Sequence, residues 1–554
     1  MTGPPAARPV GDVLAAALAD LGVATAFGVI SIHNMPLLDA MARQGRIRFV
    51  PARGEAGAMN MADAYARVGR RLGVCITSTG TAAGNAAGAQ LEALAAGSPV
   101  LHITTQIDRP LLDRDRAPIH DVPHQPDMLR AIGKQYLRVW EPSAAVALLH
   151  AAAHAALSAP AGPVALELPV DVQLAVAAPP LRPATLHIVP PPPDPALLDD
   201  VAALLRRAAR PMLWLGGGAR GAAAAAAALA GRGIGVVTST NGRATVPEGH
   251  PLSLGAFGMT AEAQALYDRA DLLLVVGSRL RGNETRNNAL RLPRPLVQID
   301  ADPTRAGRNY PADLFIAGDA RLALEGLLAR LPQRLDTDPA FLGAIAPARA
   351  AAEAALAVAL GPYARIAATL GDRVAAGRHP WVRDVTVANS TFGNRLVRLA
   401  APHLGVHALG GGIGQGIGMA IGAAHADAGR VVALLGDGGA QLALGELATA
   451  AEQAAEIVFV LMNDRGYGVI RNIQNAQYGG RRAYADLLTP DFALICRAVG
   501  LPHARVARVE DFAAALEQAL TARGPVMIEV DMTAIGPFAE AFAGPPAGAA
   551  GTVR

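Results

Sequence analysis

Two acidic residues stand where strand-like runs end, with about one helix of chain between them. Asp437 follows the apolar run RVVALLG, and Asp464 follows EIVFVLMN. The segment between them, GELATAAEQAA, has a helical composition. A right-handed β-α-β crossover places both strand ends at one edge of a parallel sheet, where open α/β sheets bind ligands. Two carboxylates at that edge repel each other unless a cation lies between them.

Oxygen donors of this kind suit Mg²⁺ or Ca²⁺, and a cation that keeps water ligands commonly shares phosphate oxygens. Gly438 and Gly439 leave backbone N–H groups free to reach those phosphates at the start of the following helix. The alternative is that each Asp only caps a helix. The spacing of the pair favours a metal-diphosphate site.

Two further stretches are candidates for chemistry. Glu55 lies between the strand-like run FVP and the helical segment AGAMNMADAYAR, where it is either a catalytic acid or an ordinary helix-start residue. The segment HALGGGIGQGIGMAIGAAHA, residues 407–426, is too rich in glycine for an ordinary helix. Its Gly-x-Gly spacings raise the possibility of a dinucleotide loop. No long strand precedes it and no suitably spaced acid follows, which disfavours a nicotinamide-dependent oxidoreductase.

These stretches together resemble thiamine-diphosphate (ThDP) enzymes, in particular acetolactate synthases and 2-oxo acid decarboxylases of the benzoylformate decarboxylase type. The Gly-Asp-Gly at 436–438, the Asn-Asp at 463–464 and the segment around Glu55 carry the resemblance, which extends over residues 8–535. It implies a Mg²⁺ ion held by Asp437, Asp464 and the carbonyl of Gly466. Asp464 stands where the family usually has Asn, so one ligand gains a charge.

The resemblance also implies roles around the cofactor. Glu55 would contact N1′ of the aminopyrimidine ring and favour the tautomer whose 4′-amino group acts as a base. Gly411 would offer its carbonyl to that amino group, and Ile413 would bend the cofactor into its V shape. Ser390 and Thr391, at the end of an expected strand DVTVANS, are candidate diphosphate ligands. The implied cofactor-binding set is Glu55, Ser390, Thr391, Gly411, Ile413, Asp437, Gly438, Gly439, Asp464, Gly466 and Tyr467.

The loop FGVISIHNMP bears on the substrate. Ile32 occupies the position where related decarboxylases have Ser or Asp, and His33 follows it. Ser78 stands where benzoylformate-type decarboxylases have His, and the paired His of pyruvate decarboxylases is unmatched. His120 lies close to the sequence position at which acetolactate synthases use a Gln. We therefore take Glu55, Ile413, His120 and His33 as catalytic candidates, with a structural hydrogen bond as the alternative for either histidine.

These departures disfavour a standard pyruvate or benzoylformate decarboxylase. We expect a ThDP- and Mg²⁺-dependent enzyme that cleaves or forms a C–C bond next to a carbonyl, by acetolactate synthase-like carboligation or by decarboxylation of a 2-oxo acid. The alternative is a decarboxylase of a 2-oxo acid other than pyruvate, or a C–C lyase without FAD. A non-catalytic regulatory homologue would be expected to lose Glu55 or the acidic pair, and both are retained.

Strand-like and helix-like runs alternate along all 554 residues, which predicts three consecutive doubly wound parallel-sheet α/β domains. Their order in the family is a pyrimidine-binding domain, a middle domain and a pyrophosphate-binding domain. The expected boundaries are 1–177 for the pyrimidine-binding domain, 178–195 for a Pro-rich linker, 196–332 for the central nucleotide-binding-like domain, 333–360 for a second linker, 361–540 for the pyrophosphate-binding domain and 541–554 for the C-terminal tail.

The middle domain and the assembly raise two further expectations from the resemblance. Acetolactate synthases bind FAD there and oxalyl-CoA decarboxylases bind ADP. Candidate nucleotide contacts are Gly216–Gly218, Arg220, Arg279, Arg281, Asp300 and Asp302, which could equally belong to ordinary turns.

Family members place the cofactor between two subunits, so we expect a homodimer or homotetramer with active sites at the subunit interface.

Composition excludes several other classes. The formal net charge of +3 comes from nearly balanced acids and bases, and no basic run supports nucleic-acid binding. Cys75 and Cys496 lie in apolar runs, which predicts buried thiols in a reducing compartment. No signal-type segment is visible, and no charge-free apolar stretch reaches membrane-spanning length outside Ala-rich helical pattern. We expect a cytoplasmic protein without a membrane partner.

Overall fold

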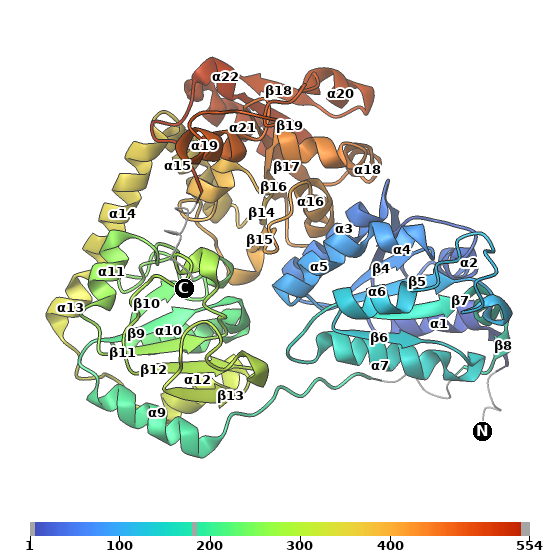
Figure 1. Ribbon diagram of the computed structural model, residues 1–554, viewed down its shortest axis with the longest axis horizontal. Helices are drawn as coiled ribbons and strands as arrows, with labels where there is room; N and C mark the ends of the chain where they lie inside the picture. The colour runs from blue at the N-terminus through green and yellow to red at the C-terminus, as the bar shows by residue number, and fades with distance from the viewer. Residues whose placement is uncertain (1–5, 180–184, 545–554) are drawn as a thin grey trace.

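The structure, a computed structural model, describes residues 6–179 and 185–544. Three parallel β-sheets lie one after another along the chain, each flanked by helices, and they form the three lobes seen in Figure 1. The expected three α/β domains are confirmed. In the predicted Pro-rich linker, residues 178–179 and 185–194 form neither helix nor strand. Residues 1–5 and 545–554, including most of the predicted tail, lie outside the described residues.

The N-terminal domain has a six-stranded sheet of order β3-β2-β4-β5-β7-β6, and β1 pairs with β8 in a separate antiparallel ribbon. Alternate residues of a strand enter different cores, as Cys75 and Val74 of β4 show. The strands are β1 (Arg8–Pro9), β2 (Thr25–Gly28), β3 (Arg48–Pro51), β4 (Gly73–Thr77), β5 (Val100–Gln106), β6 (Gln135–Arg138), β7 (Val164–Pro169) and β8 (Val176–Ala177). The helices are α1 (Val10–Asp20), α2 (Met35–Gln44), α3 (Glu55–Gly69), α4 (Thr81–Asn85), α5 (Ala87–Ala96), α6 (Gln125–Ile132), α7 (Ala145–Leu157) and α8 (Val170–Leu174).

The middle domain has a five-stranded sheet of order β10-β9-β11-β12-β13. Its strands are β9 (Pro211–Leu215), β10 (Gly235–Thr238), β11 (Leu272–Val276), β12 (Leu296–Asp300) and β13 (Leu314–Ala317). Its helices are α9 (Pro195–Arg207), α10 (Ala223–Gly231), α11 (Ala261–Tyr267) and α12 (Ala320–Arg330).

The second predicted linker is mostly helical, with α13 (Pro339–Gly343) and α14 (Ile345–Leu360). By length and composition alone, Pro339–Leu360 could cross a membrane. It nevertheless contains Arg349 and Glu353, and Arg349 donates to three middle-domain carbonyls, those of Glu248, His250 and Ser253. The helix is thereby bonded to the middle domain.

The C-terminal domain has a six-stranded sheet of order β15-β14-β16-β17-β19-β18. Its strands are β14 (Trp381–Arg383), β15 (Gly405–His407), β16 (Val431–Gly436), β17 (Ile457–Asn463), β18 (His503–Val506) and β19 (Val526–Asp531). Its helices are α15 (Tyr363–Ala376), α16 (Gly416–Ala424), α17 (Asp437–Ala440), α18 (Glu446–Glu452), α19 (Gly468–Gln477), α20 (Phe492–Ala498), α21 (Phe512–Thr521) and α22 (Met532–Ile535).

Helices α3 and α16 join the first and third domains into one shared core, visible in Figure 1 where the blue and orange lobes meet. A Cβ on Gly422 would lie 2.0 Å from the carbonyl oxygen of Met61, so the two backbones touch. The expectation that residues 407–426 could not form an ordinary helix was therefore wrong for 416–424. The glycines there allow close helix packing, and burial outweighs their low helix propensity.

Candidate active site

The structure brings Asp437 and Asp464 together. Asp437 is the first residue of α17, directly after β16, and Asp464 directly follows the neighbouring strand β17. The Asp464 N–H donates to Asp437 Oδ1 at 3.3 Å, and the Thr489 hydroxyl donates to Asp437 Oδ2 at 3.3 Å. Adjacent parallel strands thus place the two acids at one sheet edge.

Burial and, after it, the nearby Asp464 carboxylate together raise the pKa of Asp437 to about 7. Burial also raises the pKa of Asp464, while Arg471, whose guanidinium lies 2.9 Å from Asp464 Oδ2, opposes that shift. A divalent cation between the carboxylates would stabilise both charged forms. The charge distribution of this pair therefore fits a metal centre.

Gly466 adds a backbone oxygen to this pair. Its carbonyl oxygen lies 3.1 Å from the position that a Cβ on Gly438 would occupy, and the Tyr467 ring lies 2.8 Å from that position. Gly466 has φ 155°, and a Cβ on it would lie 2.3 Å from the carbonyl oxygen of Ala485, so this turn requires glycine. Residues 6–179 and 185–544 contain no group of three or more His, Cys, Asp or Glu side chains placed for a metal. The candidate centre consists of two carboxylates and a carbonyl.

Beside this centre lies the glycine arch, residues 410–414. Gly411 has φ 87°, nothing lies within 4 Å of its Cβ position, and the Ile413 side chain is 37% exposed. Asp384, a residue that sequence reasoning missed, accepts the N–H of Gly414 at 3.0 Å. It also accepts the N–H of Gly416 at 3.2 Å. Burial raises the pKa of Asp384 to about 6, opposed by these hydrogen bonds.

The strand expected over DVTVANS was wrong, because β14 ends at Arg383 and residues 389–393 form a π-helix. The Thr391 hydroxyl donates to the carbonyls of Val387 and Ala388 at 2.8 and 3.1 Å. Such back-bonds let a Thr side chain satisfy its hydroxyl within a helical turn, and they tend to bend the helix. They also commit the hydroxyl of Thr391 to the backbone. Ser390 lies half-buried on the same turn.

In the N-terminal domain, Glu55 is the first residue of α3 and is half-buried. Its Oε2 atom accepts a hydrogen bond from Asn85 Nδ2 at 3.1 Å, and Asn85 is the last residue of α4. Among the described residues, no hydrogen bond joins Glu55 to Asp437 or Asp464. Glu55 follows β3 of the N-terminal sheet, whereas the acidic pair follows β16 and β17 of the C-terminal sheet, so they lie at the edges of two different sheets.

The structure also brings His33 and His120 together. Their Nδ1 atoms are 3.2 Å apart, and the ring centroids are 5.1 Å apart. The His120 carbonyl oxygen lies 2.6 Å from the Cβ position of Gly80, two residues after Ser78. Burial lowers the pKa of His33, His120 lowers it further, and Asp108 opposes the shift. Ile32 is 57% exposed on the same loop.

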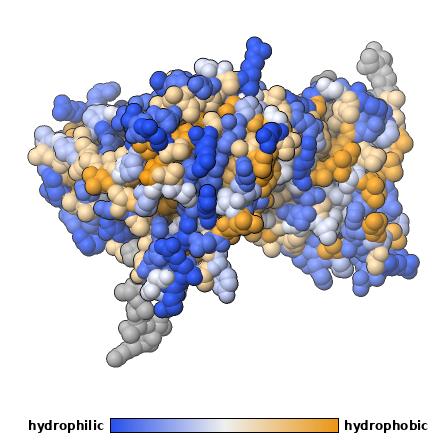
Figure 2. Space-filling model, turned by 90° about the horizontal axis from the view of Figure 1, so that it is seen from above, coloured by the Kyte–Doolittle hydropathy of each residue, from blue (hydrophilic) through white to orange (hydrophobic). Residues whose placement is uncertain are grey.

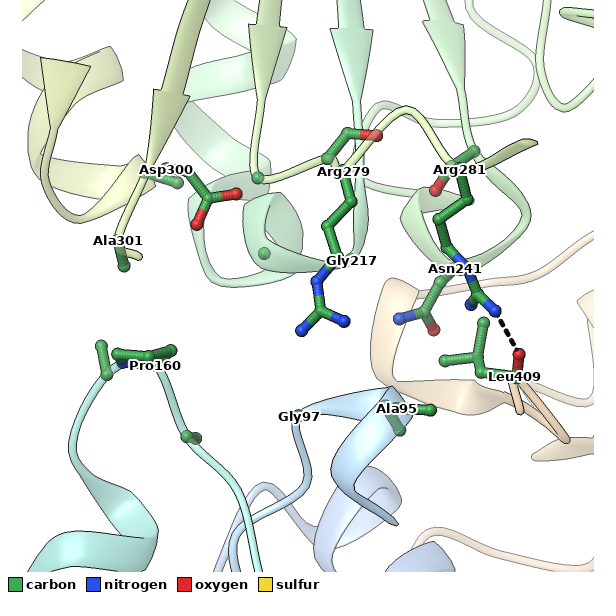
Figure 3. A pocket seen from close by; sticks show the side chains of 18 of the residues that line it. Ala95, Gly97, Pro160, Gly217, Asn241, Arg279, Arg281, Asp300, Ala301 and Leu409 are labelled. Atoms are coloured by element: carbon green, nitrogen blue, oxygen red, sulfur yellow. Dashed lines mark hydrogen bonds between the residues drawn. The ribbon is translucent and has the colours of Figure 1, made fainter. Parts of the chain in front are cut away.

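A cavity of about 290 Å³ lies at the strand ends of the middle-domain sheet and extends to the other two domains. Figure 3 shows Arg279 directed into it from one side and Asp300 on the same wall. Arg281 also lines the cavity, and its Nη2 donates to the Leu409 carbonyl at 2.6 Å. Three expected contacts, Gly216, Arg220 and Asp302, do not line this cavity. Arg220 donates to backbone carbonyls of Pro402 and Gly405, and Asp302 pairs with Arg305.

Three family models match the chain in succession. They are the N-terminal TPP binding domain (residues 8–129), the central domain (198–327) and the C-terminal TPP binding domain (387–530) of thiamine pyrophosphate enzymes.

Similar proteins include a "Probable 2-ketoarginine decarboxylase" of Pseudomonas aeruginosa, 31% identical over 499 residues, which cover 88% of each chain. An acetolactate synthase large subunit of Corynebacterium glutamicum is 27% identical, over 91% of this chain and 83% of its own. A chloroplastic acetolactate synthase of Nicotiana tabacum is 28% identical, over 94% of this chain and 81% of its own.

Proposed function

Because this chain belongs to the thiamine pyrophosphate enzymes of the acetolactate synthase and 2-oxo acid decarboxylase family, we propose that it uses ThDP and Mg²⁺ to cleave a 2-oxo acid next to its carbonyl. The observation that supports this most directly is the meeting of Asp437, Asp464 and the Gly466 carbonyl at adjoining strand ends. Hard oxygen donors with two negative charges suit Mg²⁺, which would in turn bind a diphosphate.

In this proposal, Asp437, Asp464 and the Gly466 carbonyl hold the metal, and the N–H groups of Gly438 and Gly439 face the diphosphate. Bound ThDP supplies the electron sink that lets a 2-oxo acid lose CO₂. The Ile413 side chain and the Gly411 carbonyl support the two rings from the glycine arch. Glu55, oriented by Asn85, exchanges a proton with the ring nitrogen. The Thr391 hydroxyl is committed to the carbonyls of Val387 and Ala388, so of the two residues Ser390 is the better candidate for a diphosphate contact.

Glu55 and the acidic pair occupy different sheets, so we propose that a second copy of the chain completes the site, in a homodimer or homotetramer. Large apolar side chains exposed near these segments support an interface, with Leu91 47%, Leu442 62% and Ile32 57% exposed. Figure 2 shows apolar residues lying among polar ones on one face of the molecule. Analytical ultracentrifugation checks this, and a monomer with full activity would contradict it.

We propose that His33 and His120 face the substrate and that the substrate is a 2-oxo acid other than pyruvate. Two histidines in contact at a strand-end loop can donate hydrogen bonds to a carboxylate or a carbonyl, which are the two polar groups of a 2-oxo acid. The similarity to a protein named as a 2-ketoarginine decarboxylase favours a larger substrate and decarboxylation over carboligation. A panel of 2-oxo acids assayed for CO₂ release and for ligation products tests this. His120→Ala should alter the ranking of substrates more than the affinity for ThDP.

A second proposal concerns the middle domain, whose cavity we propose to bind a nucleotide such as ADP or FAD. Arginine and aspartate side chains line its wall, together with the backbone of Gly217 and Gly218. The absorbance spectrum of the purified protein tests for a flavin. Thermal shifts with ADP and FAD, with Arg279→Ala as the comparison variant, test for binding.

A further inference from the structure

Two buried glutamates connect the first and third domains in a reciprocal way. Glu92, on α5 of the N-terminal domain, accepts the backbone N–H groups of Leu409 and Gly410 in the C-terminal domain, the latter at 2.6 Å. Glu446, on α18 of the C-terminal domain, accepts the backbone N–H groups of Arg53 and Gly54 in the N-terminal domain, each at 3.0 Å. Each domain therefore holds two consecutive N–H groups of the other.

Both carboxylates are almost fully removed from solvent, with Glu92 2% and Glu446 4% exposed. A buried carboxylate is costly unless it is paired and hydrogen-bonded. Arg67, itself held by Asp63, lies 3.5 Å from Glu92 Oε1. The Thr449 hydroxyl donates to Glu446 Oε2 at 2.7 Å. Each glutamate is thus fixed by its own domain before it reaches across.

The N–H groups that they bind lie at the start of, or directly before, the segments proposed to meet the cofactor. Leu409 directly precedes the glycine arch and Gly410 is its first residue, and Arg53 and Gly54 directly precede Glu55. The fit is close on both sides. A Cβ on Gly410 would lie 2.7 Å from Glu92 Oε2, and a Cβ on Gly57 would lie 2.1 Å from Glu446 Oε1. Glycine at these positions makes room for the carboxylates.

We propose that Glu92 and Glu446 are reciprocal positioning residues, each setting the backbone of the cofactor-facing segment that belongs to the opposite domain. This inference rests on the proposed function, because the roles of the glycine arch and Glu55 come from it. All these contacts lie within one chain. Each subunit therefore sets both segments before a second copy completes the site.

Replacement by glutamine keeps the shape of the side chain but offers one acceptor oxygen in place of two. In Glu92→Gln, the Leu409 and Gly410 N–H groups compete for that oxygen, and the new amide donor faces an N–H group. In Glu446 the Arg53 and Gly54 N–H groups already share Oε1, so Glu446→Gln acts by removing the negative charge of their acceptor, which weakens both hydrogen bonds. Losing one hydrogen bond to a charged group corresponds to roughly tenfold faster local opening. Glu248→Gln is the matched control, because Glu248 accepts the Leu399 N–H at 2.8 Å across another domain boundary and pairs with Arg243 of its own domain.

The first readout is amide hydrogen exchange of the full-length protein without cofactor. Glu92→Gln should speed exchange about tenfold in peptides covering 405–416, and Glu446→Gln in peptides covering 50–57. Each variant should leave the other peptide unchanged, and Glu248→Gln should leave both unchanged. Exchange at the wild-type rate in both target peptides, or equal acceleration throughout the protein, would overturn the proposal. If either glutamine variant does not fold, the aspartate variant at that position takes its place, because it keeps the charge but shortens the reach.

The second readout is ThDP binding in the presence of Mg²⁺, followed calorimetrically. The apparent affinity should fall by about tenfold in Glu92→Gln and in Glu446→Gln, and stay at the wild-type value in Glu248→Gln. Wild-type affinity in both target variants would overturn the positioning role. Failure of the wild-type protein itself to bind ThDP would instead overturn the proposed function, so the two failures are distinguishable.

Discussion

Replacing Gly468 with alanine tests the metal centre without removing a charge. Gly468 is the first residue of α19, and a Cβ there would lie 1.8 Å from Asp464 Oδ2, where ordinary contacts begin at 3.4 Å. The carboxylate oxygen must therefore retreat by about 1.6 Å, whereas metal–ligand distances tolerate only about 0.2 Å. The substitution therefore displaces Asp464 from the position in which it would bind Mg²⁺.

The usual effect of replacing glycine by alanine in a helix is stabilising, in contrast to the loss expected at the metal centre. Alanine stabilises a helix by up to about 1 kcal/mol relative to glycine, so a simple helix effect leaves the protein as stable or more stable. Losing a carboxylate ligand should instead lower the apparent affinity for Mg²⁺, measured at fixed ThDP, by at least about 100-fold, or about 2.7 kcal/mol.

The assay is a Mg²⁺ titration at fixed ThDP, followed by intrinsic fluorescence. Gly231→Ala, at the end of α10 with nothing within 4 Å of the Cβ position, is the control. If Gly468→Ala keeps the Mg²⁺ dependence of the wild type, Asp464 is not a ligand and the reasoning fails.

Three other predictions follow from the same structure. Glu55→Gln should keep Mg²⁺-dependent ThDP binding but lose about 10²–10⁴-fold in the rate of CO₂ release, and unchanged turnover would remove its catalytic assignment. Burial raises the pKa of Asp384 to about 6, so proton binding favours the folded state and the free energy of unfolding falls by up to about 3 kcal/mol as pH rises from about 4 to about 6. The Asp384→Asn side chain cannot titrate, so denaturation between pH 4 and 7 should show that this part of the pH dependence of the free energy of unfolding is lost. A pH profile identical to that of the wild type would contradict the assignment. Burial raises the pKa of Cys496 to about 12 and that of Cys75 as well, so a thiol reagent at pH 8 should label neither cysteine until the protein is denatured.

Much of the fold could be predicted because the central strands are long, apolar and bounded by turn residues. Four of the strands that the sequence did not indicate, β6, β13, β15 and β18, lie at sheet edges. The short ribbon of β1 and β8 and the three-residue interior strand β14 were also not indicated. Edge strands such as QYLR in β6 and HARV in β18 are short and half-exposed, so they lack the continuous apolar run of a buried strand.

The acidic pair could be predicted because a β-α-β unit fixes where two strand ends meet. The turn at Ser390 and Thr391 could not be predicted, because the β-branched residues of DVTVANS indicate a strand whereas residues 389–393 form a π-helix. The contact between His33 and His120 depends on a loop that returns from 87 residues away. The roles of Glu92 and Glu446 could not be predicted either, because an acidic residue within a helix indicates a solvent-exposed side chain unless the partner domain is known.

The most direct test of the central claim is a crystal structure of the protein grown with ThDP and Mg²⁺. We expect a Mg²⁺ ion bound by Asp437, Asp464 and the Gly466 carbonyl, with the diphosphate beside Gly438. We also expect Glu55 from a second copy to lie within hydrogen-bonding distance of the aminopyrimidine ring. Cofactor bound elsewhere, or bound here with Glu55 of both copies remote from the ring, would contradict it.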